Sequence, residues 1–132
     1  MIKIRLIRRE DLLEANKLLN NFSNKKIGLN KGSSFTIVAI CDGEICGLLK
    51  AFVRVNQITL TKDYYISNLV VAANYQMMGV ATELISYLEE KGKQENIKHI
   101  YTLVSEKNED LTKLYNKLNY DLKNISCFRR EL

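Results

Sequence analysis

The fold of this chain is decided by the stretch Asn68-Leu69-Val70-Val71-Ala72-Ala73-Asn74-Tyr75-Gln76-Met77-Met78-Gly79-Val80-Ala81-Thr82. It opens as an apolar run with β-branched residues, which is typical of a buried strand, and then passes through a short polar turn. After the glycine, apolar residues recur at the spacing of a helix face, at Val80, Ala81, Leu84, Ile85 and Leu88. The stretch therefore predicts a strand, a turn and the beginning of a helix.

The beginning of this helix carries little side-chain bulk. N–H groups in the first turn of a helix lack internal partners, and the helix dipole adds partial positive charge there. The segment is therefore a candidate phosphate cradle, with a plain strand-to-helix turn as the alternative. Neither GxxxxGK[ST] nor a GxGxxG after a strand occurs, so we expect no P-loop and no Rossmann dinucleotide site.

Length and composition indicate a single soluble domain that covers residues 1–132. The chain has 46% hydrophobic and 27% charged residues, which is typical of a globular protein with its own core. No apolar run approaches the ~20 residues that a membrane-spanning helix needs, and the N-terminus lacks the apolar centre of a signal peptide. We therefore expect a cytoplasmic protein without a membrane partner.

The basic charge of the chain is scattered rather than gathered in one patch. The formal net charge is +5, but the pairs Arg8-Arg9, Lys25-Lys26 and Arg129-Arg130 do not extend into longer basic runs. Most lysines fall on polar helix faces or in turns, where water solvates them. Nucleic acid is therefore not an expected partner, and a nucleic-acid-binding domain is only a third interpretation.

The cysteines and the histidine do not form the pattern of a metal site. Cys41, Cys46 and Cys127 are odd in number and lack metal-ligand spacing. Cys41 and Cys46 flank an Asp42-Gly43 turn signal, so we expect them in adjacent strands as small hydrophobic residues, without a disulfide scaffold or a zinc site. We expect a structural role for His99 and no metal cofactor.

Strand and helix patterns alternate along the chain without a linker or a repeat. Strands are expected at residues 2–7, 35–41, 44–55, 64–71 and 97–104, with one or two more in 120–132. Helices are expected at 9–20, at 79–91 with Gly92 as the stop signal, and after the N-cap Asn108. The loop at 21–34 has room for a short helical turn. This order is that of an α/β or α+β protein.

Two of these segments match motifs of a known family. The residues Gln76-Met77-Met78-Gly79-Val80-Ala81 fit the pattern Arg/Gln-x-x-Gly-x-Gly/Ala in register. Asn108 followed by Leu114-Tyr115-Asn116-Lys117-Leu118-Asn119-Tyr120 is similar to Asn…(Phe/Leu)-Tyr-x-x-x-Gly-(Phe/Tyr). With the hairpin at 42–47 and the N-terminal residues 4–12, these motifs resemble the GNAT superfamily of N-acetyltransferases over nearly the whole chain.

The resemblance implies a GNAT-like fold, in which six to seven strands form a mixed, mostly antiparallel sheet flanked by about four helices. It also implies that the strand ending at Val71 and the strand at 100–104 diverge. The strand edges exposed in such a slot offer N–H and C=O groups to a peptide-like pantetheine arm. Acetyl-CoA is therefore the implied co-substrate.

The implied acetyl-CoA site takes residues from three elements. They are Leu69, Val70 and Val71 on the strand, Gln76, Met77, Met78, Gly79, Val80, Ala81 and Thr82 at the turn and helix start, and Asn108 before the last helix. The pyrophosphate would lie on the N–H groups of residues 77–82. Asn108 would form a hydrogen bond to the pantetheine. The alternative, that Asn108 is simply the N-cap of its helix, explains the residue at least as well.

The implied reaction is the transfer of an acetyl group to a primary amine by direct attack in a ternary complex. A backbone N–H near residues 69–71 would polarise the thioester carbonyl. Tyr115 is the candidate general acid for the departing sulfur, with a modest effect because a thiol of pKa about 8.5 leaves readily. The alternative for Tyr115 is a core tyrosine on the apolar stripe of its helix.

The chain departs from the family pattern at four places. Many members have a glutamate in or before the pantetheine strand, whereas here only Asp63 is acidic in that neighbourhood. The general base is therefore open between Asp63, a tyrosine, a chain of waters and bulk solvent. Gln76 replaces a commoner arginine, Met77 a common glycine, and Asn119 another glycine, whose left-handed conformation asparagine tolerates.

The missing strand glutamate supports an alternative function, a catalytically weak acyl-CoA-binding regulatory module. For an enzyme, we expect the acceptor pocket to form from the first helix, the 21–34 loop and the 57–63 connection. A small-molecule amine and a peptide amine both stay open as acceptors. Exposed terminal strands make a homodimer possible.

Overall fold

The computed structural model of the protein describes residues 1–30, 32–123 and 126–132. Its strands are β1 (Ile2–Leu6), β2 (Ser34–Cys41), β3 (Glu44–Val55), β4 (Lys62–Val71) and β5 (His99–Thr102). Its α-helices are α1 (Leu12–Asn20), α2 (Val80–Gln94) and α3 (Glu109–Lys117), and short 3-10 turns lie at η1 (Arg9–Asp11) and η2 (Ala73–Tyr75). No helix within these ranges is both long enough and apolar enough to cross a membrane.

The strands form one mixed sheet in the order β1-β2-β3-β4-β5. Each pair from β1 to β4 is antiparallel, whereas β4 and β5 run in parallel. The β2–β3 hairpin turns at Asp42 and Gly43, which both have positive φ angles, as the turn signal predicts. The mixed, mostly antiparallel sheet is therefore confirmed.

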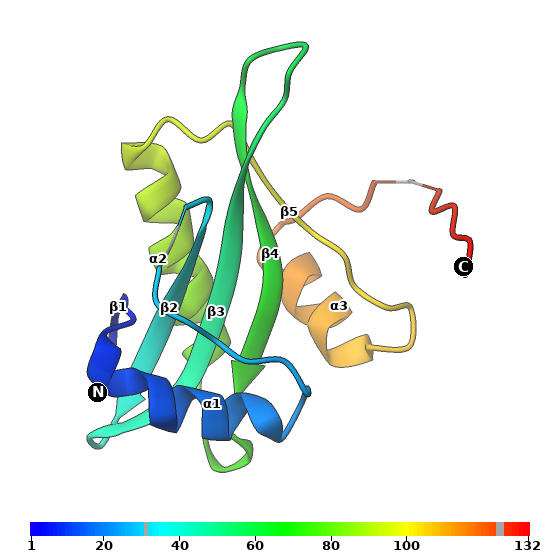
Figure 1. Ribbon diagram of the computed structural model, residues 1–132. Helices are drawn as coiled ribbons and strands as arrows, with labels where there is room; N and C mark the ends of the chain where they lie inside the picture. The colour runs from blue at the N-terminus through cyan, green and yellow to red at the C-terminus, as the bar shows by residue number, and fades with distance from the viewer. Residues whose placement is uncertain (31, 124–125) are drawn as a thin grey trace.

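Helices cover both faces of the sheet (Figure 1). On one face, Leu18 and Leu19 of α1 pack with Val38 of β2 and Leu48 of β3. On the opposite face, α2 and α3 pack on a second cluster that includes Leu84, Leu88, Tyr64 and Tyr115. The loop after α1 crosses the same face as α1, and its Ile27 is buried in the α1 cluster.

The helix α2 approaches β3 closely at Gly47. A Cβ atom built on Gly47 would lie 2.8 Å from Cγ1 of Val80 and 3.1 Å from the carbonyl oxygen of Val70. Real side chains do not occupy such a position, so the absence of a side chain here lets the first turn of α2 rest on the sheet. Gly47 thus permits the close contact between the first turn of α2 and the sheet.

The number of elements is lower than expected, and this corrects the prediction of six to seven strands and about four helices. The described part of the chain has five strands and three α-helices. The segment 120–132 forms no strand in its described residues, where 121–123 and 126–132 are exposed, because no neighbouring strand supplies a hydrogen-bonding partner. The 21–34 loop holds no helix in its described residues either.

The expected end of α2 at Gly92 is also wrong. The helix continues to Gln94, and Gly92 is buried inside it, where a Cβ would lie 3.3 Å from the ring of Tyr64. Gly92 therefore serves close packing against β4. The left-handed residue that follows the helix is Asn96, with φ of 59°.

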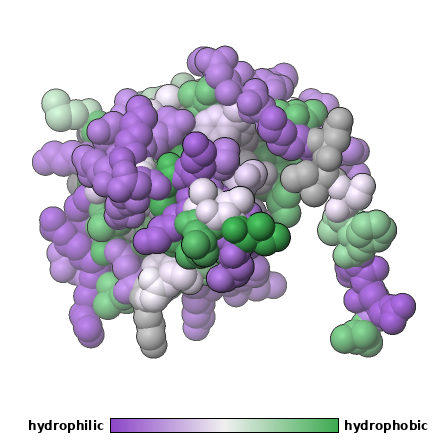
Figure 2. Space-filling model, turned by 90° about the horizontal axis from the view of Figure 1, so that it is seen from above, coloured by the Kyte–Doolittle hydropathy of each residue, from purple (hydrophilic) through white to green (hydrophobic). Residues whose placement is uncertain are grey.

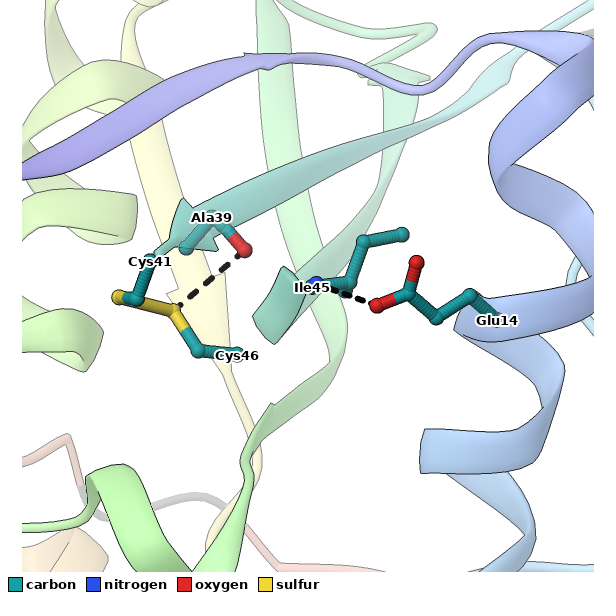
Figure 3. The surroundings of a disulfide bond; sticks show 5 residues. All are labelled: Glu14, Ala39, Cys41, Ile45 and Cys46. Carbon is teal, nitrogen blue, oxygen red and sulfur yellow. Dashed lines mark hydrogen bonds between the residues drawn. A yellow bond between two sulfur atoms is a disulfide. The ribbon is translucent and has the colours of Figure 1, made fainter. Parts of the chain in front are cut away.

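The two cysteines beside the hairpin turn form a disulfide, which corrects the expectation that they are unpaired. Cys41 and Cys46 are bonded, with their Cα atoms 5.8 Å apart (Figure 3). Cys46 falls at an irregularity in the pairing of β2 with β3, which brings its side chain to the face that Cys41 occupies. The neighbouring Ile45 N–H donates to the Glu14 carboxylate of α1 (2.6 Å), which ties the hairpin to that helix.

Candidate functional site

The strand β4 has a free edge over its second half. It pairs with β3 from Lys62 to Val71, but its pairing with β5 runs only from Asp63 to Ile66. Over the described residues, no strand pairs with Ser67–Val71 on the β5 side. Leu69, Val70 and Val71 are half-buried there. Backbone groups alternate in direction along a strand, so only the N–H and C=O groups that point away from β3 face this edge and are available to an extended ligand.

The turn between β4 and α2 is held against the end of the strand. The side-chain amide of Gln76 donates to the carbonyl oxygen of Val71 (3.2 Å), and the N–H of Ala72 donates to the carbonyl of Cys46 (2.8 Å). Met77 and Gly79 both take left-handed backbone, with φ of 66° and 82°. These two reversals aim the chain into α2, of which Gly79 is the N-cap.

The backbone amides at the start of α2 are bare. In the described structure, no acceptor bonds the N–H groups of residues 77–82, and the first bond is donated by Glu83 to the carbonyl of Gly79 (3.0 Å). A Cβ built on Gly79 would meet no atom within 4 Å. The side chains of Met77 and Met78 are exposed and do not cover the turn. The side chain of Val80 is buried and anchors the helix. Only the backbone N–H of Val80 is therefore offered to a ligand at this site. An anionic diphosphate fits this arrangement.

Asn108 is the N-cap of α3. Its side-chain oxygen accepts a hydrogen bond from the N–H of Leu111 (3.1 Å), so the interpretation of Asn108 as a helix cap is confirmed. The side-chain NH₂ group makes no bond within the residues described and stays available to a ligand. Asn108 also borders an open hollow of about 490 Å³ between Ser105 and Asp110.

Tyr115 lies inside the core, on the inner side of α3. Its side chain is buried, and its ring lies 5.2 Å from that of Tyr120. Burial raises the pKa of the Tyr115 phenol, and interaction with the Thr102 side chain lowers it by a smaller amount. Thr102 is the last paired residue of β5 and donates to the carbonyl of Ile66 (3.2 Å). Tyr115 is thus placed near the point where β4 and β5 separate.

Asp63, one of the candidate bases, lies at the far end of the paired region. Its carboxylate is largely buried, with one oxygen 3.4 Å from Nδ1 of His99. That oxygen has no hydrogen bond in the described residues. Asp63 pairs with His99, three positions before the strands separate, so it stands away from the free edge.

Three elements that the sequence places in one site converge in the fold. Two further residues at this site are not predicted from the sequence. The free edge of β4, the start of α2 and the inner side of α3 all border the separation of β4 from β5. Gly47 and Thr102 were not predicted. An isolated glycine inside a strand pattern signals a close backbone approach and would have drawn attention to Gly47. Thr102 carries no such signal.

The exterior is mainly hydrophilic at the end of the sheet that carries the β3–β4 connection (Figure 2). Ile58 and Leu60 of that connection are exposed apolar residues. The C-terminal residues extend away from the body of the molecule in both views. In the described residues, no group of three or more His, Cys, Asp or Glu side chains is arranged to hold a metal ion.

A comparison with protein families finds one match. The model of the acetyltransferase (GNAT) family matches residues 4–120. A search of curated proteins finds no match.

Solved structures share the fold at low sequence identity. AAC(6')-Iy in complex with the bisubstrate analog CoA-S-monomethyl-acetylneamine superposes with a TM-score of 0.87 at 16% identity, over 100% of this chain and 99% of that one. The ribosomal-protein-alanine N-acetyltransferase from Brucella melitensis biovar Abortus 2308 has a TM-score of 0.87 at 19% identity, over 99% and 100%. The aminoglycoside acetyltransferase meta-AAC0020 from an uncultured soil metagenomic sample, in complex with sisomicin, has a TM-score of 0.85 at 18% identity, over 99% of this chain and 96% of that one.

Proposed function

Because this chain belongs to the acetyltransferase (GNAT) family and is therefore an acyltransferase, we propose that it moves an acetyl group from acetyl-CoA to a primary amine. The amine attacks the thioester directly while both substrates are bound, within one domain of residues 1–132. The observation that carries the proposal is the row of bare amides at residues 77–82, next to a strand with a free edge.

Each predicted cofactor-binding residue has a physical role in this proposal. Leu69, Val70 and Val71 offer backbone groups to the pantetheine arm. Residues 77–82 offer N–H groups to the diphosphate, and Gln76 holds their turn against Val71. The free side-chain NH₂ of Asn108 donates to a carbonyl of the arm.

Acetyl-CoA supplies the acetyl group as an activated thioester. A C–N bond forms to the acceptor as the C–S bond breaks, so the amine gives up a proton and the sulfur takes one. A backbone N–H near residues 69–71 stabilises charge on the carbonyl oxygen. Tyr115 protonates the sulfur, and its raised pKa keeps the phenol protonated at neutral pH.

The proton from the amine goes to solvent or to a side chain near the free edge of β4. Between Tyr64 and Val71 this strand carries no acidic residue, and Asp63 lies at its far end. This same observation favours the second candidate function, an acyl-CoA-binding module with weak catalysis. Both functions require binding of acetyl-CoA, but only the enzyme releases free CoA in the presence of an amine.

A binding and turnover experiment tests the proposal. Acetyl-CoA at about a hundred times its Kd should add ~2.7 kcal/mol to the free energy of unfolding, measured as a thermal shift. S-acetylpantetheine, which lacks the diphosphate, should give a smaller shift at the same concentration. Thiol release on addition of an amine panel then separates the enzyme from the binding module. Equal shifts with both thioesters would contradict the phosphate cradle.

The matched structures widen the range of acceptors to test. They include an aminoglycoside acetyltransferase and a ribosomal-protein-alanine N-acetyltransferase, so a small amine and a peptide amine both belong in the panel. A cytoplasmic location and a homodimer stay predictions from the sequence.

A further inference from the structure

The sheet has an uncovered area on the face that α1 occupies, which we call the open face. Its residues are Lys50, Phe52, Arg54, Tyr65 and Tyr101, and Asp63 lies on the same face opposite Arg54. Residues two apart along a strand share a face, so the three β3 residues lie on the same side as Leu48, which packs against α1. Tyr65 pairs with Phe52 on one side and with Tyr101 on the other. Tyr101 is 44% exposed.

The open face adjoins the proposed site of acyl transfer. Tyr65 and Tyr101 form the pair just before Ile66 and Thr102, the last pair of β4 and β5. Lys50 pairs with Asn68, at the beginning of the free edge. An acceptor that lies on this face therefore brings its amine to the separation of the strands from the side opposite α2.

Two cations stand on this face without a carboxylate partner. The guanidinium of Arg54 lies 4.3 Å from the centre of the Tyr65 ring, and Nζ of Lys50 lies 5.2 Å from that of Phe52. Neither forms an ion pair among the residues that the structure describes. A guanidinium stacked on a ring is held in place while the N–H donors in its plane stay free.

Asp63, the acidic residue opposite Arg54, forms no ion pair with it. Asp63 pairs with Arg54 across β3 and β4, but its carboxylate lies largely buried beside His99. Two neighbouring segments, the loop after α1 and the β3–β4 connection, contain no acidic residue. Residues 21–34 contain three lysines and no Asp or Glu, and residues 56–61 carry no charge. Lys50 and Arg54 therefore outnumber the carboxylate of Asp63 on this face of the sheet, which leaves it with a net positive charge.

From this charge distribution we infer that the acceptor is a primary amine that also carries a carboxylate. The carboxylate accepts hydrogen bonds from the Arg54 guanidinium, with Lys50 as a second cation, and the amine lies toward Asn68. A planar guanidinium matches two carboxylate oxygens, which fixes the orientation of the acceptor. A polycationic acceptor meets repulsion here. This inference rests on the proposed acetyl transfer.

The test uses a matched series of acceptors with acetyl-CoA. It compares ω-amino carboxylates of increasing chain length with their carboxamides and with the corresponding diamines, and it follows thiol release. The carboxylates should have a KM about tenfold below that of the carboxamides, because hydrogen bonds to charged groups contribute ~1.5–3 kcal/mol. The diamines should be the poorest acceptors.

Two variants assign the effect to the open face. Arg54→Gln should raise KM for the carboxylates about tenfold and leave that for the carboxamides unchanged. The matched control Lys93→Gln removes one exposed positive charge from α2 and should change neither. Diamines as the best acceptors, or an equal effect of Arg54→Gln on all three series, would overturn the inference.

A binding measurement separates this inference from the proposed function. Calorimetry with N-acetyl-ω-amino carboxylates, the products, needs no turnover. Binding that is lost in Arg54→Gln supports the inference, and binding that is absent or unchanged in that variant overturns it. Failure of acetyl-CoA to bind in the thermal-shift experiment contradicts the proposed function by a different measurement.

Discussion

Met77 and Gly79 share the left-handed conformation at the turn before α2, although only one of them is a glycine. A Cβ atom disfavours this conformation by roughly 1–2 kcal/mol, so Met77 is a locally costly residue. In the motif that the turn resembles, glycine is common at the position of Met77. The structure gives the reason, because both positions require the same unusual backbone.

The charge of a side chain at Gly79 tests the phosphate cradle. Asparagine and aspartate both tolerate left-handed backbone and have nearly the same shape. Gly79→Asp should weaken acetyl-CoA binding about tenfold or more relative to Gly79→Asn, because a carboxylate would stand beside the diphosphate. Calorimetry measures both, and circular dichroism checks that both fold. Equal affinities of the two variants would place the diphosphate elsewhere.

The phenol of Tyr115 tests the proton transfer. Tyr115→Phe should lower kcat by about tenfold, a modest effect because the thiolate leaves readily, and should leave acetyl-CoA affinity unchanged. Burial raises the pKa of this phenol, so it stays protonated up to its ordinary value near 10 and should cause no loss of rate between pH 7 and 9. The matched control is Tyr120→Phe, which removes the neighbouring phenol that donates to Glu89. If both variants retain the full rate, Tyr115 is a packing residue.

Asn108 acts on α3 as a whole element. As its N-cap, it satisfies the N–H of Leu111, and replacing a cap by alanine costs about 1 kcal/mol. Asn108→Ala should therefore lower the free energy of unfolding. Asn108→Asp keeps an oxygen acceptor for the cap but loses the NH₂ donor.

The comparison of these two variants separates capping from binding. Asn108→Asp should fold as stably as the original protein in urea titrations and bind acetyl-CoA more weakly. Unchanged affinity in Asn108→Asp would restrict Asn108 to its role in the helix.

The elements that the sequence predicts well have a local cause, and those that it predicts poorly depend on distant partners. The hairpin at Asp42-Gly43 and the capped helix after Asn108 follow from short patterns, and the structure confirms both. The strand expected in 120–132 needs a neighbour, which no local pattern reveals. Gly92 matches a stop signal, but a contact with Tyr64 in another element determines its role.

The candidate site shows the same division. The order of strand, turn and helix at 68–82 is legible in the sequence because periodicity and a glycine mark it. The separation of β4 from β5 and the bare amides depend on the tertiary structure, so no local sequence pattern reveals them. The disulfide between Cys41 and Cys46 likewise depends on an irregular register that no residue count predicts.

At the scale of the whole molecule, a partly buried ion pair links stability to pH. Arg5 of β1 donates two hydrogen bonds to Asp11 (2.5 and 3.0 Å), and the N–H of Arg8 adds a third (2.7 Å). The hydrogen bonds from Arg5 hold the pKa of the Asp11 carboxyl below its ordinary value. The ionised form is therefore stabilised on folding.

This linkage predicts acid sensitivity. A carboxyl whose pKa is lowered on folding contributes stability above its unfolded pKa of about 3.9, and that contribution falls as the pH drops further. Asp11→Asn should cost about 2 kcal/mol at pH 7 and less below pH 4, measured by urea unfolding. The control Glu10→Gln, at an exposed neighbour, should change stability little. A constant difference between Asp11→Asn and the original protein across this range would contradict the linkage.

The unpaired half of β4 bears on how such an enzyme evolves. A ligand gripped by main-chain atoms is indifferent to most side chains, since every amino acid except proline brings the same donor and acceptor. Related proteins can then replace nearly every residue along this strand and still bind the ligand, provided that the distance between the two strands is preserved. The property that is conserved in this case is the distance between the two strands. Conservation of that distance accounts for a shared fold among proteins whose sequences are no longer similar.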